Sequence, residues 1–260
     1  MKKLNKPATK CRIYVWPLET LYIGPIHASG AVVYSGNVIC VSLGAPFNIK
    51  VGNGPWIKTC LASTPAGVVH EVRSTPSTII AKYWVEKDSL HNSSLAQFPL
   101  VFEKGNFHSK KSIFDTFREI YEKSLNSDDV KNCLNNVFRF AEHEPCKIDS
   151  RIQHVSKIIR NEPDYNHSIS FLASEVDLSS SRLLHLIKQE TGVTYRRYRM
   201  WQRIRYVLSI YGLQESLTQS SLESGFSDSA HFTRCFKSFY GTTPSSVLKS
   251  LEIYEVDSII

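Results

Sequence analysis

The sequence predicts an α+β protein, with short strands in its N-terminal part and helices in the rest. Between residues 10 and 105, apolar and alternating runs recur at roughly ten-residue spacing and are separated by Gly and Pro, as in sandwiches and small barrels. From Lys110 onward, apolar residues recur every three or four positions, which is the period of a helix. Residues 168–250 contain the sequence pattern of a short helix, a turn and a second helix twice.

The composition is that of a globular protein of one large or two ordinary domains: 260 residues, 42% of them hydrophobic, with a formal net charge of +7. We divide the chain into an N-terminal domain at residues 1–147 and a helical domain at residues 148–260. No apolar signal core follows the basic first residues, and no run approaches the roughly 18 apolar residues of a membrane helix. We therefore expect a cytoplasmic protein.

Eight runs in the N-terminal part have the pattern of strands. The turn signals between them include Gly24-Pro25 and the hairpin signal Ser35-Gly36-Asn37. The predicted strands are Arg12–Trp16, Leu21–Ile23, Ala31–Tyr34, Val38–Leu43, Phe47–Val51, Trp56–Leu61, Val68–Val72 and Thr78–Val85.

A pair of antiparallel helices is predicted at about residues 110–144. The apolar stripe of the first helix consists of Ile113, Phe114, Phe117, Ile120, Tyr121 and Leu125, and that of the second of Val130, Leu134, Val137, Phe138 and Ala141. Asn126 to Asp129 supply the turn and the cap. Two wide stripes exceed what one barrel face needs, so we expect the pair both to cover the strands and to form a homodimer surface.

The first repeat begins after a helix at Arg151–Asn161. Ser168 is placed to cap a short helix, and Ser179 to cap a second helix that Gly192 ends. Inward-facing positions follow helical spacing in both helices, namely Ile169, Leu172, Ala173 and Val176, then Leu183, Leu186 and Ile187. This is the outline of a helix-turn-helix, whose second helix can enter the major groove of DNA.

The second repeat has the same outline. Ser216, Leu217, Leu222 and Phe226 occupy places comparable to those of the first copy, and Ser227 is a candidate cap. Phe232, Phe236 and Phe239 line the inward side of the second helix, which Gly241 ends. The opposite side carries Ser229, His231, Thr233 and Arg234. A single copy would be an ordinary helical hairpin, whereas two in tandem favour nucleic-acid binding.

A basic helix at about Thr194–Gly212 joins the repeats. It carries five arginines, and no Asp or Glu lies between Glu190 and Glu215. Such a helix has either a solvated face or an anionic partner, and between two groove-binding units the natural anion is a phosphate backbone. Its apolar stripe consists of Tyr198, Trp201, Ile204, Leu208 and Tyr211.

These residues resemble the DNA-binding domain of AraC/XylS-type transcription regulators, over about 100 residues. The resemblance rests on Ala173, Ser179, Leu183, Lys188 and Gly192, on Arg203, Val207 and Leu208, and on the stretch Gly225-Phe-Ser-Asp-Ser-Ala-His-Phe-Thr-Arg-Cys-Phe-Lys237 with Gly241, Thr243 and Pro244. Ile187 stands where the family prefers Phe, Val207 where it has Ala, and Ser221-Leu222 where it has Ile-Ala. A helix interface can absorb such swaps.

The resemblance implies binding to double-stranded promoter DNA and, as partners, RNA polymerase and a small-molecule effector. The positions that resemble DNA contacts are Ser181, Leu184, His185 and Lys188 in the first unit, Arg196 and Arg199 in the joining helix, and Ser229, Ala230, His231, Thr233 and Arg234 in the second unit. Ser181 and Leu184 are weak hydrogen-bonding residues, so the first unit is expected to recognise a thymine methyl or DNA shape.

The stretch Pro65 to His70 resembles the end of a cupin-like half-barrel, the sensor domain often found ahead of this DNA-binding domain. Trp16, Tyr34, Trp56, Tyr83 and Trp84 are either ordinary core or the lining of an effector site, and the ligand-binding set that we predict is His27, Tyr34, Trp56 and His70. No metal is expected, because His27 and His70 lack the further ligands that a metal centre needs.

The main prediction is a transcription regulator without cofactor or catalytic activity. The alternatives are a cupin-type metal-dependent enzyme with a helical appendage, and a module whose helices bind protein. No Ser/His/Asp set, paired carboxylates or phosphate loop is visible, and six cysteines show no metal-like spacing. The regulator hypothesis requires His185 and Arg234 to face outward on one common side.

Overall fold

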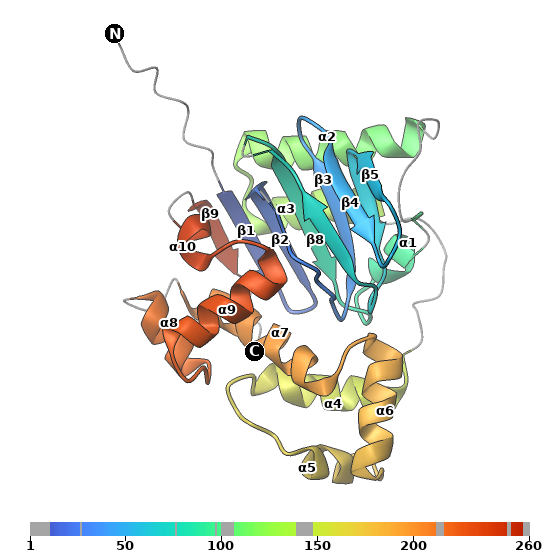
Figure 1. Cartoon of the computed structure of the whole chain (residues 1–260), viewed down its shortest axis with the longest axis vertical. Helices are drawn as coiled ribbons and strands as arrows, with labels where there is room; N and C mark the ends of the chain where they lie inside the picture. Colours follow the sequence, from blue (N-terminus) through green and yellow to red (C-terminus); the bar gives the residue numbers. More distant parts are fainter. Residues whose placement is uncertain are drawn as a thin grey trace.

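The computed structural model describes residues 11–26, 28–75, 77–96, 98–99, 107–138, 148–211, 216–248 and 251–256, and it confirms the α+β class. Two sheets and a covering helix pair form one part of the molecule, which we call the β region (Figure 1). Helices from residues 148–248 form the other part, the helical region. Within the described residues, no helix has the length and apolar character to cross a membrane.

The larger sheet has six strands in the order β6-β3-β8-β2-β1-β9. Five of them come from the N-terminal part: β1 (Cys11–Trp16), β2 (Glu19–Pro25), β3 (Asn37–Ser42), β6 (Leu61–Thr64) and β8 (Ile79–Val85). The smaller sheet has the order β5-β4-β7, with β4 (Phe47–Val51), β5 (Trp56–Thr59) and β7 (His70–Arg73).

Three predicted strands differ from the structure. Residues 31–34 make only an isolated bridge between Val32 and His70, so the expected hairpin at Ser35 does not form. The run Trp56–Leu61 is divided between β5 and β6, which belong to different sheets. β2 continues through Gly24-Pro25, because both residues pair with β8, opposite Ile80 and Ile79.

The larger sheet buries both of its faces. One face shares a core with the smaller sheet, in which Ile13, Tyr22 and Cys40 lie with Phe47 and Ile49. The other face is covered by α2 (Phe107–Lys123) and α3 (Ser127–Phe138), which place Ile113, Phe117, Ile120, Val130, Leu134, Val137 and Phe138 against Tyr14, Leu21, Ile39 and Tyr83. A short helix, α1 (Asn92–Ala96), lies at the edge of this second core.

The helix pair therefore covers the sheet as expected. Its buried residues are used by the β region itself, while Phe114, Tyr121 and Leu125 remain only partly buried. Ala141 lies outside the described residues, and the dimer surface at residues 110–144 stays a prediction.

The helical region repeats one local design. It consists of α4 (Ser150–Asn161), α5 (Ile169–Ser174), α6 (Ser180–Thr191), α7 (Tyr195–Ile210), α8 (Leu217–Glu223), α9 (Ser229–Tyr240) and α10 (Pro244–Leu248). The side chains of Ser168 and Ser216 cap α5 and α8, and left-handed Gly192 and Gly241 end α6 and α9. Ser179 caps α6 as predicted, whereas α9 is capped by Asp228 rather than by Ser227.

The buried side of α8 also differs from the prediction. Leu222 is 45% exposed, whereas Ser220, Ser221 and Ser224 are fully buried. Each of these hydroxyls donates to a carbonyl three or four residues earlier in the chain. Because each hydroxyl has this local hydrogen bond, burying the serine costs little free energy.

The chain returns to the β region after α10. Residues Leu251–Val256 form β9, which pairs in parallel with β1 as the sixth strand of the larger sheet. The sequence division at residue 148 placed this segment with the helices. Its alternation, Leu-Glu-Ile-Tyr-Glu-Val, was the available signal for a strand.

Candidate nucleic-acid interface

The predicted contact residues of α6 lie on its solvent side. Ser181, Leu184, His185 and Lys188 are exposed, while Leu183, Leu186 and Ile187 are buried among α4, α5 and α7 residues. Leu184 is 42% exposed, so this apolar side chain lies on the predicted contact face of α6. Ser179 caps the start of α6. The helical spacing of Leu183, Leu186 and Ile187 then places these apolar side chains on one face and the predicted contact residues on the other.

The second unit divides in the same way. Ser229, Ala230 and Arg234 of α9 are exposed, and His231 and Thr233 are half-buried at the edge of the same face. Phe232, Phe236 and Phe239 are each about 1% exposed and point into the core. His185 and Arg234 therefore both face outward, which is one of the two conditions of the regulator hypothesis; that they lie on a common side stays a prediction.

The turns inside the two units are also equivalent. Each contains one residue in the left-handed region, Asp177 with φ 53° in the first and Gly225 with φ 77° in the second. A Cβ on Gly225 would lie 2.6 Å from the Asp164 carbonyl oxygen, so only glycine fits there. Asp177 is exposed in the first unit, and aspartate tolerates this backbone conformation.

Both recognition helices end against the β region. A Cβ added to Gly192 would lie 2.5 Å from the Gly67 Cα, and one added to Gly241 would lie 2.7 Å from the Ser29 Cβ. The N-terminal turns of α6 and α9 therefore lie at the ends remote from these contacts. Helix-turn-helix proteins use those turns to contact base edges.

The arginines of α7 do not form one anion-binding face. Arg203 and Arg205 are buried, and Arg197 donates to the Val33 carbonyl at 2.7 Å with its guanidinium over the Phe239 ring. Arg203 donates to the carbonyls of Pro163, Asp164 and Gly225. The uncompensated charge in the sequence is thus largely used inside the fold, which differs from both the solvated face and the external anionic partner that the sequence predicted.

Arg196 is the exposed arginine of the joining helix, and Arg199 is half-buried with its guanidinium 5.5 Å from the Tyr195 ring centre. Arg196 borders a surface groove of about 340 Å³ between α7 and α9, together with His231 and Cys235. Arg234 lies close enough to influence Cys235 electrostatically. The structure therefore brings one predicted phosphate contact, Arg196, and one predicted base contact, His231, to the same groove.

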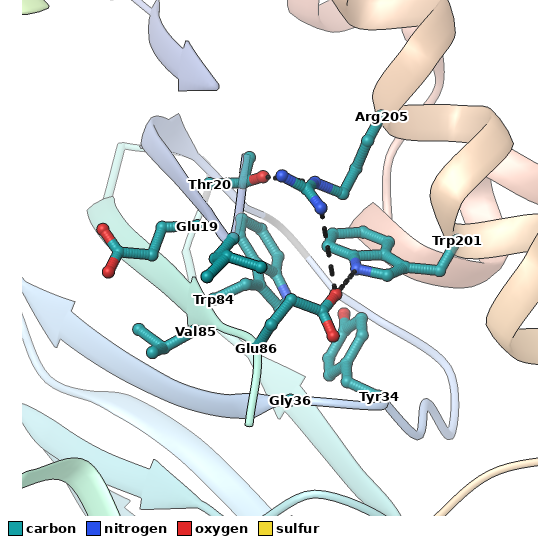
Figure 2. Close-up of a pocket in the computed structure, with 10 residues that line it drawn as sticks. Glu19, Thr20, Tyr34, Gly36, Trp84, Val85, Glu86, Trp201 and Arg205 are labelled. Carbon is teal, nitrogen blue, oxygen red and sulfur yellow. Dashed lines mark hydrogen bonds and ion pairs between the residues drawn. The ribbon is translucent and has the colours of Figure 1, made fainter. Parts of the chain in front are cut away.

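The acidic partner of α7 comes from the β region. Glu86, directly after β8, accepts from Trp201 Nε1 at 2.6 Å and from Gln202 Nε2 at 3.3 Å, and Arg205 Nη1 lies 4.0 Å away (Figure 2). Burial raises the pKa of Glu86, and the Arg205 charge partly offsets this. Arg205 also donates to Thr20 and to the carbonyls of Trp16 and Pro17.

The next two residues continue the contact. Lys87 pairs with Glu190 of α6 at 2.9 Å, and Asp88 pairs with Arg160 of α4 at 2.9 Å. Three consecutive charged residues of the β region thus bind three different helices of the helical region. The residues around Glu86, among them Tyr34, Trp84, Trp201 and Arg205, leave no room for a water molecule. This contact between the two regions, which we call the seam, is therefore tightly packed.

The predicted ligand-binding residues are divided between two places. Tyr34 and His70 are buried with ring centres 5.4 Å apart, whereas Trp56 is 37% exposed on β5 beneath the Arg73 guanidinium. His27 lies outside the described residues. Of the other aromatics, Trp84 lies in the core with Tyr34, but Trp16 and Tyr83 lie under the α2–α3 pair.

Lys82 is the residue that sequence reasoning missed at this place. It is fully buried, with Nζ 5.9 Å and 5.8 Å from the ring centres of Tyr34 and Trp84, and its ammonium has no hydrogen-bond acceptor among the described residues. Within the same described residues, His70 Nε2 and Trp84 Nε1 are also buried without a hydrogen-bond partner. Burial lowers the pKa of Lys82, and lowers that of His70 to about 3. A lysine in the middle of the apolar run of β8 was the available signal.

No metal site is evident in the described part of the chain. No three His, Cys, Asp or Glu side chains converge there as metal ligands would.

Comparison with known proteins decides the class of the helical region. Residues 172–250 match a family model described as a helix-turn-helix domain. The arabinose operon regulatory protein of Escherichia coli is 32% identical over 105 residues, which cover 40% of this chain and 35% of that protein. Residues 172–250 form a helix-turn-helix domain similar to that of the arabinose operon regulatory protein. The Msm operon regulatory protein of Streptococcus mutans is 28% identical over 104 residues, 39% of this chain and 37% of that protein.

The AraC-type match therefore spans only about a third of the length of these curated relatives. Solved structures extend the similarity in fold to the β region. An apo variant of ToxT from Vibrio cholerae has a TM-score of 0.59 at 14% identity, covering 90% of this chain and 98% of that one. Wild-type ToxT with an unsaturated fatty acid bound has a TM-score of 0.56 at 14% identity, covering 96% and 98%. At this identity, the likeness concerns the fold alone.

Proposed function

We propose that this protein is a sequence-specific DNA-binding transcription regulator whose AraC-type domain binds promoter DNA through α6 and α9. The observation that carries the proposal is the matched exposure of both recognition helices, each with its N-terminal turn remote from the β region. Arg234 is the side chain best suited to base recognition, because arginine can bind guanine in a bidentate manner. The exposed Arg196 is suited to a phosphate contact.

Arg234→Ala should weaken binding to a preferred duplex by about 1–3 kcal/mol and relax its base preference at one position. The preferred duplex would come from selection of a random DNA pool by the wild-type protein. Fluorescence anisotropy would then compare that duplex with a scrambled one.

Lys237→Ala is the matched control for Arg234→Ala. It removes the same charge from an exposed position of α9. It should therefore weaken binding to the preferred and the scrambled duplex by a similar factor, smaller than the effect of Arg234→Ala on the preferred duplex. Sequence-specific binding would be excluded if the wild-type protein enriched no sequence from the pool and bound both duplexes alike.

The β region is proposed to bind an effector with an anionic head group, near Lys82. The buried amine and the two unpartnered ring nitrogens of His70 and Trp84 are donors or potential donors without an acceptor, and a carboxylate would supply one. ToxT structures have been solved with an unsaturated fatty acid and with a naphthalenyl butenoic acid, both of them carboxylic acids. Because Tyr34 and Trp84 also line the packed seam, such a ligand would favour an arrangement with the seam opened.

Lys82→Met should abolish discrimination between an acid and its alcohol. We expect the wild-type protein to bind oleate at least about tenfold more tightly than oleyl alcohol, and Lys82→Met to bind the two equally. Titration monitored by tryptophan fluorescence would measure both affinities. Lys58→Met, on exposed β5, is the control for loss of a lysine charge. Equal affinity of the wild-type protein for acid and alcohol would exclude an anionic effector site.

RNA polymerase and a homodimer through residues 110–144 remain proposed partners. A cytoplasmic location follows from the proposed function. The metal-dependent enzyme hypothesis gains no supporting observation from the described residues, because no three potential ligands converge there.

A further inference from the structure

The C-terminal strand ties the second helix-turn-helix unit to the β region. β9 pairs with the outer edge of β1 in parallel, from Cys11 opposite Leu251 to Val15 opposite Val256. Only residues 249 and 250 separate β9 from the end of α10. Three peptide steps span at most about 11 Å, so α10 cannot move far from the sheet while β9 stays paired.

The second unit is held between this strand and α7. Val247 of α10 is buried in the same core as Phe232, Phe236 and Phe239 of α9, and Leu251 packs against that core. The same core contains Cys11, Ile13 and Val15 of β1. Pairing of β9 therefore holds α9 and α10 against the sheet, in addition to the contact of α9 with α7.

The orientation that results does not suit two adjacent grooves. Units that dock on successive turns of straight B-DNA differ by a shift of about 34 Å along the duplex, so their recognition helices must have the same orientation. In Figure 1, α6 runs along the vertical axis of the view while α9 runs obliquely to it. Seating both helices on one straight duplex thus requires the second unit to rotate relative to the first.

We infer that β9 is a conformational latch: while it is paired with β1, it holds the second unit in an orientation in which only one recognition helix can occupy its groove. Release of β9 frees the second unit to rotate, so that both helices bind. This inference rests on the proposed DNA-binding function. It assigns a regulatory role to residues 251–256, which lie outside the matched helix-turn-helix segment.

A disulfide between β1 and β9 tests the latch in the full chain. Leu251→Cys places a thiol opposite the native Cys11, and neighbouring strands have a Cα separation within the range that a disulfide accepts. We expect the oxidised variant to bind a selected two-unit duplex at least about tenfold more weakly than the same variant after reduction. Both forms should bind a one-unit duplex equally. Leu251→Cys in a Cys11→Ser background is the control.

Ile253→Pro provides the opposite change, because proline cannot donate in the strand ladder. It should bind the two-unit duplex at least threefold more tightly than the wild-type protein, by the same physical argument. If Ile253→Pro does not fold, the comparison of the oxidised and reduced Leu251→Cys variant still tests whether β9 acts as a latch.

The duplex would be selected from a random pool by both the wild-type protein and Ile253→Pro. Failure of both to enrich any sequence would overturn the DNA-binding function and the latch with it. Enrichment followed by equal binding of the oxidised and reduced forms, or tighter binding of the oxidised form, would overturn the latch alone.

Discussion

Arg205→Met is expected to lower the free energy of unfolding by about 3–5 kcal/mol, the loss typical of removing one partner from a buried ion pair. Arg205 is 1% exposed, and its guanidinium faces Glu86 while donating to Thr20, Gln202 and the carbonyls of Trp16 and Pro17. Methionine has a similar length but no donor. Glu86 would stay buried without its cation, and two backbone carbonyls would lose their donor.

Urea unfolding followed by circular dichroism measures this loss. Arg182→Met, at an exposed position of α6, makes the same chemical change and should alter stability by less than about 0.5 kcal/mol. The double variant Glu86→Gln with Arg205→Met should recover part of the loss, because the unpaired buried charge is gone. A loss below about 1 kcal/mol in the single variant would show that the Glu86–Arg205 contact does not hold the two regions together.

Arg203→Met is expected to cost about 2–4 kcal/mol of stability and to uncouple the two helix-turn-helix units. Its guanidinium donates at 2.9–3.0 Å to Pro163 and Asp164, which precede the first unit, and to Gly225 in the turn of the second. Charged donors to buried carbonyls are worth roughly 1.5–3 kcal/mol each, and these three share one donor group, so their sum is not additive.

Uncoupling has a signature in DNA binding that simple destabilisation lacks. At a temperature where the variant remains folded, affinity for the two-unit duplex should rise at least about threefold relative to affinity for a one-unit duplex, because the bond from Arg203 to Gly225 also holds the second unit in the arrangement that paired β9 favours. Lys157→Met, on the exposed side of α4, is the matched control and should leave that ratio unchanged. Equal losses on the two duplexes would mean that Arg203 stabilises the fold without fixing the spacing of the units.

The local structure of the helical region could be predicted well from sequence, because its signals are local. A capping side chain, an apolar stripe and a terminal glycine act within about a dozen residues. Thus Ser168, Ser179, Gly192 and Gly241 all have their expected roles. The Ser227 prediction is wrong because Asp228, the next residue, is also a good capping residue, and only the backbone geometry shows which of the two caps α9.

The strands were predicted less well where their partners are remote in sequence. Ala31–Tyr34 has a strand pattern but no continuous partner, and Trp56–Leu61 serves two sheets. Pairing depends on which edges meet in space, and no local pattern encodes that. The β9 strand was missed for the same reason, because its partner β1 is about 240 residues away in the chain.

The sequence by itself determined the two helix-turn-helix units and the faces that His185 and Arg234 present, since caps and periodicity are local properties of the chain. Tertiary structure decided which arginines of α7 are buried in the fold and which remain at the surface. The five arginines of α7 are equivalent in sequence, yet Arg203 and Arg205 are buried by carbonyls and a carboxylate contributed by distant segments, while Arg196 remains at the surface. A charge is buried only where oxygen acceptors surround it, and the folded chain alone brings those acceptors together.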